Sequence, residues 1–301
     1  MKTFTEKERL CEATFQSAGP YWHAFTSGKE TSLIFADEEA FAFGMNTIAM
    51  AANIFKPIRL LAFEIMGNHF HFVLSCNEES AKSFWNYIRK RLSRSFPVVK
   101  KVTLSLKPID NLQSMRNNIV YTNRNGYVAD SAYTPFSYPW GTGRCYFLDS
   151  PVVKTLVQVF VDDRRKMFRC RTPDVPSNWA VTDGYISPES YCAIKFGMSM
   201  FRDAHHYFSL LSKSVEAYAE LAAELGDSEF LTDQELFGKL AAILKKEYGV
   251  LRLRDLGGQQ KRDLAVRLRR DFRSSNGQIR RVLGLTQYEV DALFPLTAEH
   301  L

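Results

Sequence analysis

One segment, residues 60–74, constrains the fold more than any other part of this chain. Two apolar runs, 60–66 and 70–74, flank a turn that contains Gly67 and Asn68, a pattern typical of two consecutive strands. Because side chains alternate along a strand, His69 and His71 are expected to project from one face and the intervening phenylalanines from the other. The segment therefore predicts a sheet that carries two histidines side by side.

Two neighbouring imidazoles on a sheet can chelate one metal ion. Burying both without a partner would cost free energy, which favours metal binding by His69 and His71. The alternative is an ordinary strand whose polar face carries two histidines. Another histidine, His23, is interpreted as structural, although it lies on an inner strand and could line the same site.

A second group of polar residues lies about fifty residues downstream. If residues 111–125 form a helix that ends at Gly126, then Tyr121 and Asn125 lie one turn apart on one face. That places a phenol beside an amide oxygen, which could be the third metal ligand. The alternative is an amphipathic helix with an incidental tyrosine.

These residues resemble the motifs of the single-tyrosine HUH transposases. Residues 65–74 resemble the Met-Pro-Asn-His-x-His block of that family, and residues 121–125 are similar to its Tyr-x-x-x-Asn helix. Residues 137–141, Ser-Tyr-Pro-Trp-Gly, resemble the Tyr-Pro-Trp-Ser that follows. The pattern is most similar to the REP-associated tyrosine transposases and covers about residues 20–147, roughly half of the chain.

The chain departs from the family pattern at two glycines. Gly67 stands where the family usually has proline, and Gly126 stands where proline usually follows the asparagine; both changes suit a turn and a helix end. Another alignment pairs Asn117 with the family's tyrosine and leaves no nucleophile. We prefer the alignment on Tyr121, which keeps both the phenol and the amide.

The resemblance implies a catalytic role for each of these side chains. Tyr121 would attack a DNA phosphate to give a 5′-phosphotyrosine and a free 3′-OH, and rejoining would need no external energy source. His69, His71 and Asn125 would hold Mg²⁺ or Mn²⁺, metals that suit mixed imidazole and amide-oxygen ligation. A phenol with a pKa near 10 is a poor nucleophile at neutral pH. The metal would act as a Lewis acid on the phosphate.

The order of the expected elements predicts an α+β fold. Strands at 20–26, 58–66, 69–76 and 101–107 alternate with helices at 37–54 and 78–96, after a leading helix or arm at 1–18. This β-α-β-β-α-β order predicts a ferredoxin-like antiparallel sheet, with the tyrosine helix added to it. An all-α C-terminal region with a helix-turn-helix is expected to follow. We predict a catalytic domain at 1–148, a helical connection at 149–228 and a helical DNA-binding region at 229–301.

Composition favours an intracellular nucleic-acid enzyme. The five cysteines are odd in number and show no C-x-x-C spacing, which argues against a disulfide framework or a zinc knuckle. No stretch is long and apolar enough to span a membrane, and the N-terminus lacks a signal-peptide core. A cytoplasmic protein without a membrane partner is expected. The net charge of +6 favours a polyanionic partner.

Positive charge is concentrated in two places. Residues 251–281 contain ten basic and three acidic side chains, a net of +7 against +6 for the whole chain. The other cluster follows the histidine strand and is interleaved with Trp85 and Tyr87, a mixture expected for binding unpaired DNA; alternatively, these two aromatics belong to the core. The predicted DNA-binding residues are Lys82, Arg89, Lys90, Arg91, Arg94, Arg124, Arg267, Arg269, Arg270, Arg273, Arg280 and Arg281.

Residues 275–294 fit a helix-turn-helix. A short helix with apolar residues inward would end at Gly284, and Thr286 would cap a second helix with Glu289 in a capping box. The alternative is a helical cap that serves packing alone.

Two functions remain open. The first is an enzyme that cleaves and rejoins single-stranded or hairpin DNA, acting as a monomer or homodimer, with the helical extension favouring a monomer. The second is a domesticated regulator that binds such DNA without cutting it. A phosphodiesterase that uses water in place of Tyr121 is a third, less favoured interpretation.

Overall fold

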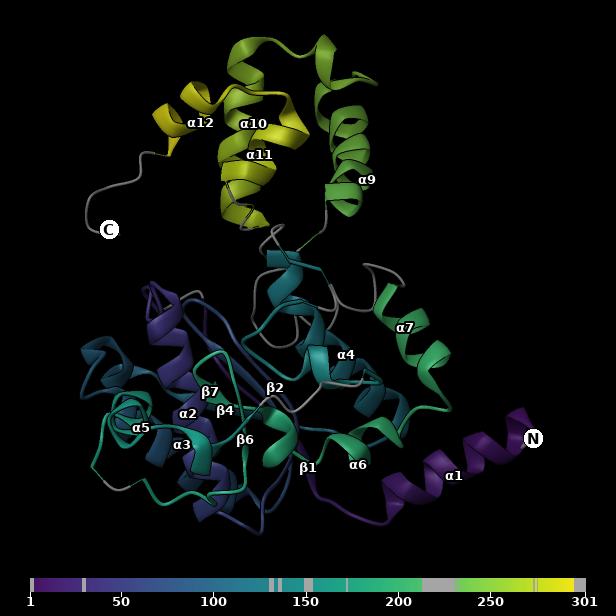
Figure 1. Ribbon diagram of the computed structural model, residues 1–301. Helices are drawn as coiled ribbons and strands as arrows, with labels where there is room; N and C mark the ends of the chain where they lie inside the picture. The colour runs from purple at the N-terminus through teal and green to yellow at the C-terminus, as the bar shows by residue number, and fades with distance from the viewer. Residues whose placement is uncertain are drawn as a thin grey trace. The chain divides into compact units, whose positions relative to one another are not determined.

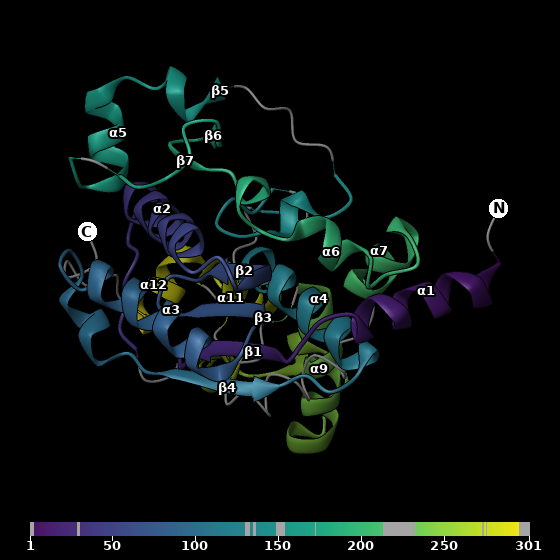
Figure 2. The same ribbon diagram turned by 90° about the horizontal axis from the view of Figure 1, so that it is seen from below.

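A four-stranded antiparallel sheet is the centre of the fold, and its strands lie in the order β2-β3-β1-β4 (Figures 1 and 2). The structure is a computed structural model that describes residues 3–28, 31–129, 133–134, 137–148, 154–171, 173–212, 231, 233–272, 274 and 276–294. Its first elements are α1 (Phe4–Gln16), β1 (Tyr21–Thr26), α2 (Glu38–Ile54), β2 (Arg59–Ile65), β3 (Phe70–Ser75), α3 (Glu78–Leu92), β4 (Leu104–Pro108) and α4 (Leu112–Ala129). The predicted α+β class is confirmed.

Smaller elements complete the chain. After α4 come β5 (Lys154–Thr155), α5 (Val161–Phe168), β6 (Ala180–Thr182), β7 (Tyr185–Ile186), α6 (Ile194–Met198) and α7 (Ala204–Ser212), then α9 (Asp233–Ile243), α10 (Gly258–Asp271), α11 (Asn276–Leu283) and α12 (Gln287–Leu293). Single 3₁₀ turns lie at Pro97–Lys101, Gly143–Cys145, Leu156–Gln158, Pro188–Ser190 and Leu253–Asp255, and a π-helical turn lies at Leu244–Tyr248. Strands β5, β6 and β7 form a second antiparallel sheet.

The chain divides into two compact units. The first contains residues 1–126 and 135–214, and the second contains 127–134 and 215–301. The three domains proposed from the sequence, 1–148, 149–228 and 229–301, stay a prediction. In the first unit α2 shares an apolar cluster with the segment that contains β6 and β7, and the buried Asn46 on α2 accepts a hydrogen bond from Ile186 N at 2.9 Å.

Strand alternation separates the two faces of the four-stranded sheet. Phe70 and Phe72 of β3 pack against α3, with ring centroids 5.3 Å from Trp85 and 5.7 Å from Phe84 respectively. His71 projects to the other face, where its ring lies 5.6 Å from that of Tyr121 on α4. Helix α3 and helix α4 therefore cover opposite faces of the sheet.

Two predicted boundaries were wrong. Helix α4 does not end at Gly126 but continues to Ala129. Gly126 is needed because a Cβ there would overlap the Tyr138 ring and Oε1 of Glu64, so the glycine serves close packing and not a helix end. Strand β3 begins at Phe70, which leaves His69 in the preceding turn.

In the second unit the end of the chain follows the predicted pattern. Helices α11 and α12 are separated by three residues, with Gly284 in the left-handed region at φ 64°. Thr286 caps α12 in a capping box with Glu289. The apolar residues of α11 pack into one cluster with α9, α10 and α12. The predicted helices and cap are confirmed.

A charged group ties α1 to α4. Arg116 on α4 is 3% exposed and donates from Nη1 and Nη2 to the Glu8 carboxylate at 2.7 and 3.2 Å, and Arg202 donates to the same group at 3.1 Å. The hydrogen bond from Arg116 is the main reason that the pKa of Glu8 is lowered.

We expect Glu8→Gln to lower the free energy of unfolding by about 1–2 kcal/mol at neutral pH, because it weakens charge-assisted hydrogen bonds to a buried guanidinium. The folded pKa of Glu8 lies below its unfolded value, so this stabilisation is present above the unfolded pKa and is lost as pH falls through the folded pKa. The difference between wild type and variant in urea unfolding should therefore shrink below about pH 4. Glu12→Gln, at an exposed position of the same helix, is the control and should show no such pH dependence. A constant difference at all pH values would contradict the assignment.

Candidate active site

The two histidines of the predicted metal pair lie together and are buried. His71 lies on β3 between Phe25 of β1 and Glu64 of β2, and His69 precedes the strand. Their ring centroids are 5.0 Å apart, with the ring planes at 82°. The structure thus brings both imidazoles to one place, although only His71 lies on the strand.

Hydrogen bonds assign the tautomer of His69. Asn68 donates from Nδ2 to the backbone oxygens of Gly28 and Thr31 at 2.8 and 2.9 Å, so its Oδ1 faces the ring. His69 Nδ1 lies 2.7 Å from that oxygen and must donate to it. In a neutral imidazole Nε2 then carries the lone pair that a metal requires.

His23 lines the site. The sequence analysis interpreted this histidine as structural but noted that it could line the site. Its Nε2 lies 3.0 Å from His71 Nδ1, and its Nδ1 lies 2.6 Å from Asn118 Oδ1 on α4. The antiparallel pairing of β1 with β3 places His23 beside His71, with Val73 as its register partner. Sequence spacing gave no signal for this contact, because it depends on strand order.

Helix α4 brings Tyr121 to the histidines. The Tyr121 ring centroid lies 5.6 Å from that of His71 and 6.1 Å from that of His23. Tyr121 is 3% exposed. Asn118 precedes it by nearly one turn and Asn125 follows by one turn, so the three share a face of the helix. The predicted association of the tyrosine with the histidine pair is therefore present.

Asn125 is buried, and its Nδ2 has no hydrogen-bond partner among the described residues. Among the described residues, no hydrogen bond from Nδ2 therefore explains the amide as a structural group. It offers a carbonyl oxygen, a donor type compatible with Mg²⁺ or Mn²⁺. The adjacent Arg124 is also buried, which argues against an open phosphate-binding surface at that position.

A buried carboxyl that the sequence analysis missed lies on the same sheet face. Glu64 of β2 is the register partner of His71 and is 1% exposed. Burial raises the pKa of Glu64 well above its usual range, against the opposing effect of a hydrogen bond from Gly126 N–H. Its Oε2 has no hydrogen-bond partner within the described ranges. A charged residue inside the apolar run 60–66 was the available signal.

The aromatic loop at residues 138–142 closes the edge of this site. Ile65 N donates to Trp140 O at 2.8 Å, and Thr142 N donates to Phe63 O at 2.9 Å. Tyr138 donates its hydroxyl to Ile65 O at 2.7 Å. The motif that resembles the family's Tyr-Pro-Trp-Ser thus joins β2 as backbone and packs beside Gly126.

The side chains at this site are in part suited to hold a divalent cation. Two imidazoles and a buried amide are suitable kinds of ligand. No group of three or more His, Cys, Asp or Glu side chains is placed to hold a metal in the described part of the chain. Glu64 therefore does not form such a group with the histidine pair.

The basic cluster of α3 lies on the sheet face opposite Tyr121, and its role in DNA binding stays a prediction. Trp85 is 3% exposed and belongs to the core on the phenylalanine face, and Tyr87 packs against the α2 cluster. Lys82 pairs with Glu78 at 2.5 Å, and Arg91 donates to Phe168 O. Because α3 covers the face opposite Tyr121, its remaining predicted DNA-binding residues Arg89, Lys90 and Arg94 lie across the sheet from the phenol.

Several C-terminal arginines are paired with acidic residues. Arg267 contacts Glu247 and Asp271, and Arg281 contacts Asp233. Arg270 contacts Asp271 but is 74% exposed. Arg269 and Arg280 are exposed and bond to polar uncharged groups. Arg273 lies outside the described residues.

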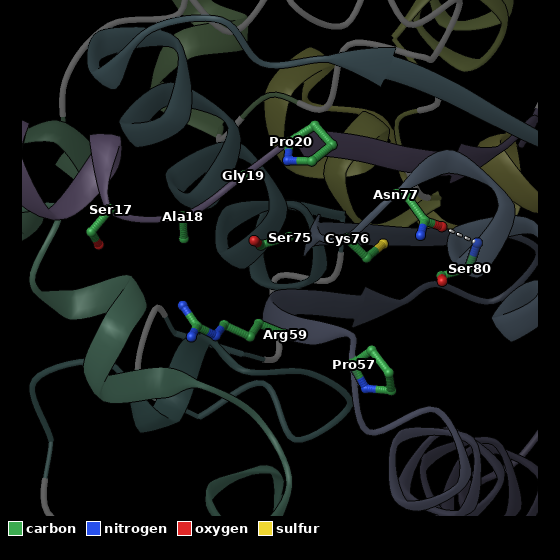
Figure 3. Close-up of a pocket in the computed structure, with 10 residues that line it drawn as sticks. All are labelled: Ser17, Ala18, Gly19, Pro20, Pro57, Arg59, Ser75, Cys76, Asn77 and Ser80. Carbon is green, nitrogen blue, oxygen red and sulfur yellow. Dashed lines mark hydrogen bonds between the residues drawn. The ribbon is translucent and has the colours of Figure 1, made fainter.

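A separate pocket lies at the other end of the strands (Figure 3). It has a volume of about 410 Å³ and is lined by the end of β3, the start of α3 and the approach to β1. Arg59 points into it, and Asn77 Oδ1 accepts a hydrogen bond from Ser80 N at 2.7 Å. Its lining includes none of the predicted site residues.

No helix in the described ranges is long and apolar enough to cross a membrane. No family model and no curated protein sequence matches this chain. Among solved structures, the chain is similar to a REP-associated tyrosine transposase bound to a REP hairpin. That similarity has 15% sequence identity and a TM-score of 0.34, and it covers 55% of this chain and 87% of the other.

Proposed function

We propose that this protein cleaves and rejoins single-stranded or hairpin DNA through Tyr121. The observation that carries the proposal is the placement of the Tyr121 ring 5.6 Å from His71, within a buried pair of histidines. A phenol, two imidazoles and an amide one turn away form the set that the motif resemblance implies. A packing role alone would not require these four polar side chains together.

The strand order supports the same proposal. We infer a ferredoxin-like core from the sheet order β2-β3-β1-β4, which is built from a β-α-β-β-α-β succession. We infer that this is the HUH nuclease core, with α4 added on the histidine face. The histidine-bearing strand β3 is central, which gives the site a rigid floor.

In the proposed reaction the Tyr121 oxygen attacks the scissile phosphorus as its proton is lost. The new bond joins the tyrosine oxygen to phosphorus, the bond from phosphorus to the 3′ oxygen breaks, and that oxygen takes up a proton. The product is a 5′-phosphotyrosine and a free 3′-OH. Attack by another 3′-OH reverses the step and releases Tyr121 with the DNA rejoined.

His69 and His71 would hold Mg²⁺ or Mn²⁺ through Nε2, and Asn125 would do so through its amide oxygen. The cation would supply positive charge to a non-bridging phosphate oxygen. His69 is oriented by Asn68, so its ring is set before DNA arrives.

The second unit is proposed to contribute DNA binding through a helix-turn-helix formed by α11 and α12. Tyr288 near the start of α12 is 84% exposed, and the exposed Arg280 lies near the end of α11. These are suitable contacts for bases and phosphates.

We expect Arg269→Ala with Arg270→Ala to weaken DNA binding and to lower the slope of log K against log salt by about 1 to 2, because each phosphate contact releases counterions. Fluorescence anisotropy at several salt concentrations measures this slope. Arg281→Ala is the comparison variant, since Asp233 already neutralises that side chain, and it should change the slope less. An unchanged slope in the double variant would remove both residues from the DNA surface.

The burial of Tyr121 favours a second candidate function. A phenol that is 3% exposed has little access to a phosphate in this conformation. A regulator that binds hairpin DNA without cleaving it would need no such access.

A covalent-trapping experiment separates the two functions. Purified protein is incubated with Mn²⁺ and labelled hairpin oligonucleotides of varied sequence, then run on a denaturing gel, with EDTA as the control. A protein–DNA band that survives denaturation and requires the metal supports cleavage by tyrosine. A hairpin that binds tightly in a mobility assay but gives no covalent band and no cut strand would assign the protein to the regulatory class.

A further inference from the structure

We propose that His23, backed by Asn118, is a positioning residue that fixes the tautomer of His71 and presents its Nε2 to a divalent cation. This inference rests on the proposed function, because it concerns a ligand of the same site. It adds a role for two residues that touch neither the phosphate nor the cation in that scheme.

The direction of the hydrogen bonds begins at a backbone carbonyl. Asn118 donates from Nδ2 to Ser114 O at 2.8 Å, and a carbonyl oxygen can only accept. This contact orients the amide, so Asn118 Oδ1 faces His23 Nδ1 at 2.6 Å. An amide oxygen also only accepts, which requires His23 Nδ1 to carry a proton.

The proton on His23 Nδ1 determines the next contact. His23 is fully buried, which favours the neutral ring, and a neutral imidazole with Nδ1–H accepts at Nε2. His71 Nδ1 lies 3.0 Å from that nitrogen and is therefore the donor. His71 Nε2 is then the nitrogen with the lone pair.

The same arrangement holds the other histidine of the pair. His69 donates from Nδ1 to Asn68, whose amide is itself fixed by two backbone carbonyls. Each ligand histidine is thus oriented by an asparagine amide anchored to the main chain, directly for His69 and through His23 for His71. Partners of this kind typically contribute a factor of about 10 to 100 to metal affinity.

Three variants test the relay. His23→Phe fills the space without a hydrogen-bond acceptor, whereas His23→Gln can place a carbonyl oxygen near His71 Nδ1. Asn118→Leu removes the anchor but leaves His23 and His71 unchanged. The readouts are imidazole ¹⁵N shifts of the metal-free protein by NMR and Mn²⁺ affinity by electron paramagnetic resonance.

In the wild type we expect a protonated Nδ1 and an unprotonated Nε2 on His71. His23→Phe and Asn118→Leu should shift His71 toward the Nε2–H tautomer and weaken Mn²⁺ binding about 10- to 100-fold, and His23→Gln should restore most of both. Agreement between the backbone amide NMR spectra of each variant and the wild type shows that the variant is folded. If His23→Phe does not fold, Asn118→Leu is compared with the wild type in its place.

The two readouts distinguish failure of this inference from failure of the proposed function. An Nε2–H tautomer of His71 in the metal-free wild type overturns the relay, whatever the protein binds. Unchanged Mn²⁺ affinity in both His23→Phe and Asn118→Leu also overturns it. A wild type that shows the expected tautomer but binds no Mn²⁺ overturns the metal-dependent function and the cation role of the relay together.

Discussion

Tyr121→Phe is expected to abolish the covalent protein–DNA product and to reduce strand cleavage by at least about 10³-fold, because it removes the phenol oxygen that is the proposed nucleophile. The phenyl ring keeps its contacts with His71 and His23, so the site should stay packed. DNA binding should change by no more than about threefold, or roughly 0.65 kcal/mol. Denaturing gels measure the covalent product, and mobility shifts measure binding.

The matched control is Tyr191→Phe. Tyr191 is a half-buried tyrosine whose buried hydroxyl has no hydrogen-bond partner among the described residues, so its removal should leave cleavage unchanged. Cleavage at the wild-type rate by Tyr121→Phe would show that another group, such as water, attacks the phosphate. Loss of cleavage in both variants would point to a general packing defect.

Gly126→Ala is expected to have the largest effect on stability, lowering the free energy of unfolding by about 2–3 kcal/mol. A Cβ at this position would overlap the Tyr138 ring and Oε1 of Glu64, and neither neighbour can move easily. Tyr138 is held by Ile65 O, and Glu64 is a strand residue at the register position of His71. Relief of the overlap would require α4 to move away from the sheet, which would displace Asn125.

Gly238→Ala is the control for helix propensity. Gly238 also lies inside a helix, α9, but a Cβ there meets no atom within 4 Å. Its replacement should be neutral or stabilising by up to about 1 kcal/mol. Urea unfolding followed by far-UV circular dichroism suits the comparison, because Gly126 lies in the first unit and Gly238 in the second, and both units contain helices. Equal free energies of unfolding for Gly126→Ala and wild type would show that the contact of α4 with Tyr138 and Glu64 can adjust without a loss of stability.

Local periodicity predicted the elements and which candidate side chains share a face. Alternation along β3 separated His71 from Phe70, and the spacing of four on α4 put Tyr121 and Asn125 on one face. These are properties of single elements. They do not depend on how the elements pair, which is why the sequence alone was sufficient.

Three features depend on packing between elements and could not be predicted from the sequence. His23 reaches His71 only because β1 lies beside β3 in the sheet order. The basic residues of α3 follow the histidines closely in sequence, yet its apolar side packs on the phenylalanines and holds the helix on the other face. Gly126 looked like a helix end, but its close approach to Tyr138 explains the glycine. None of these contacts has a signature in residue spacing.

The loop at 138–142 has a further consequence for association between copies of the chain. Strand β2 is an edge of the four-stranded sheet, and an open edge can pair with a strand of another molecule. Here the main chain of the loop already occupies part of that edge, through Trp140 O, Thr142 N and the bridge between Glu64 and Gly141. The opposite edge strand, β4, carries Lys107 and ends at Pro108, features that discourage strand addition. The loop beside the histidine face therefore also protects the sheet from templated aggregation.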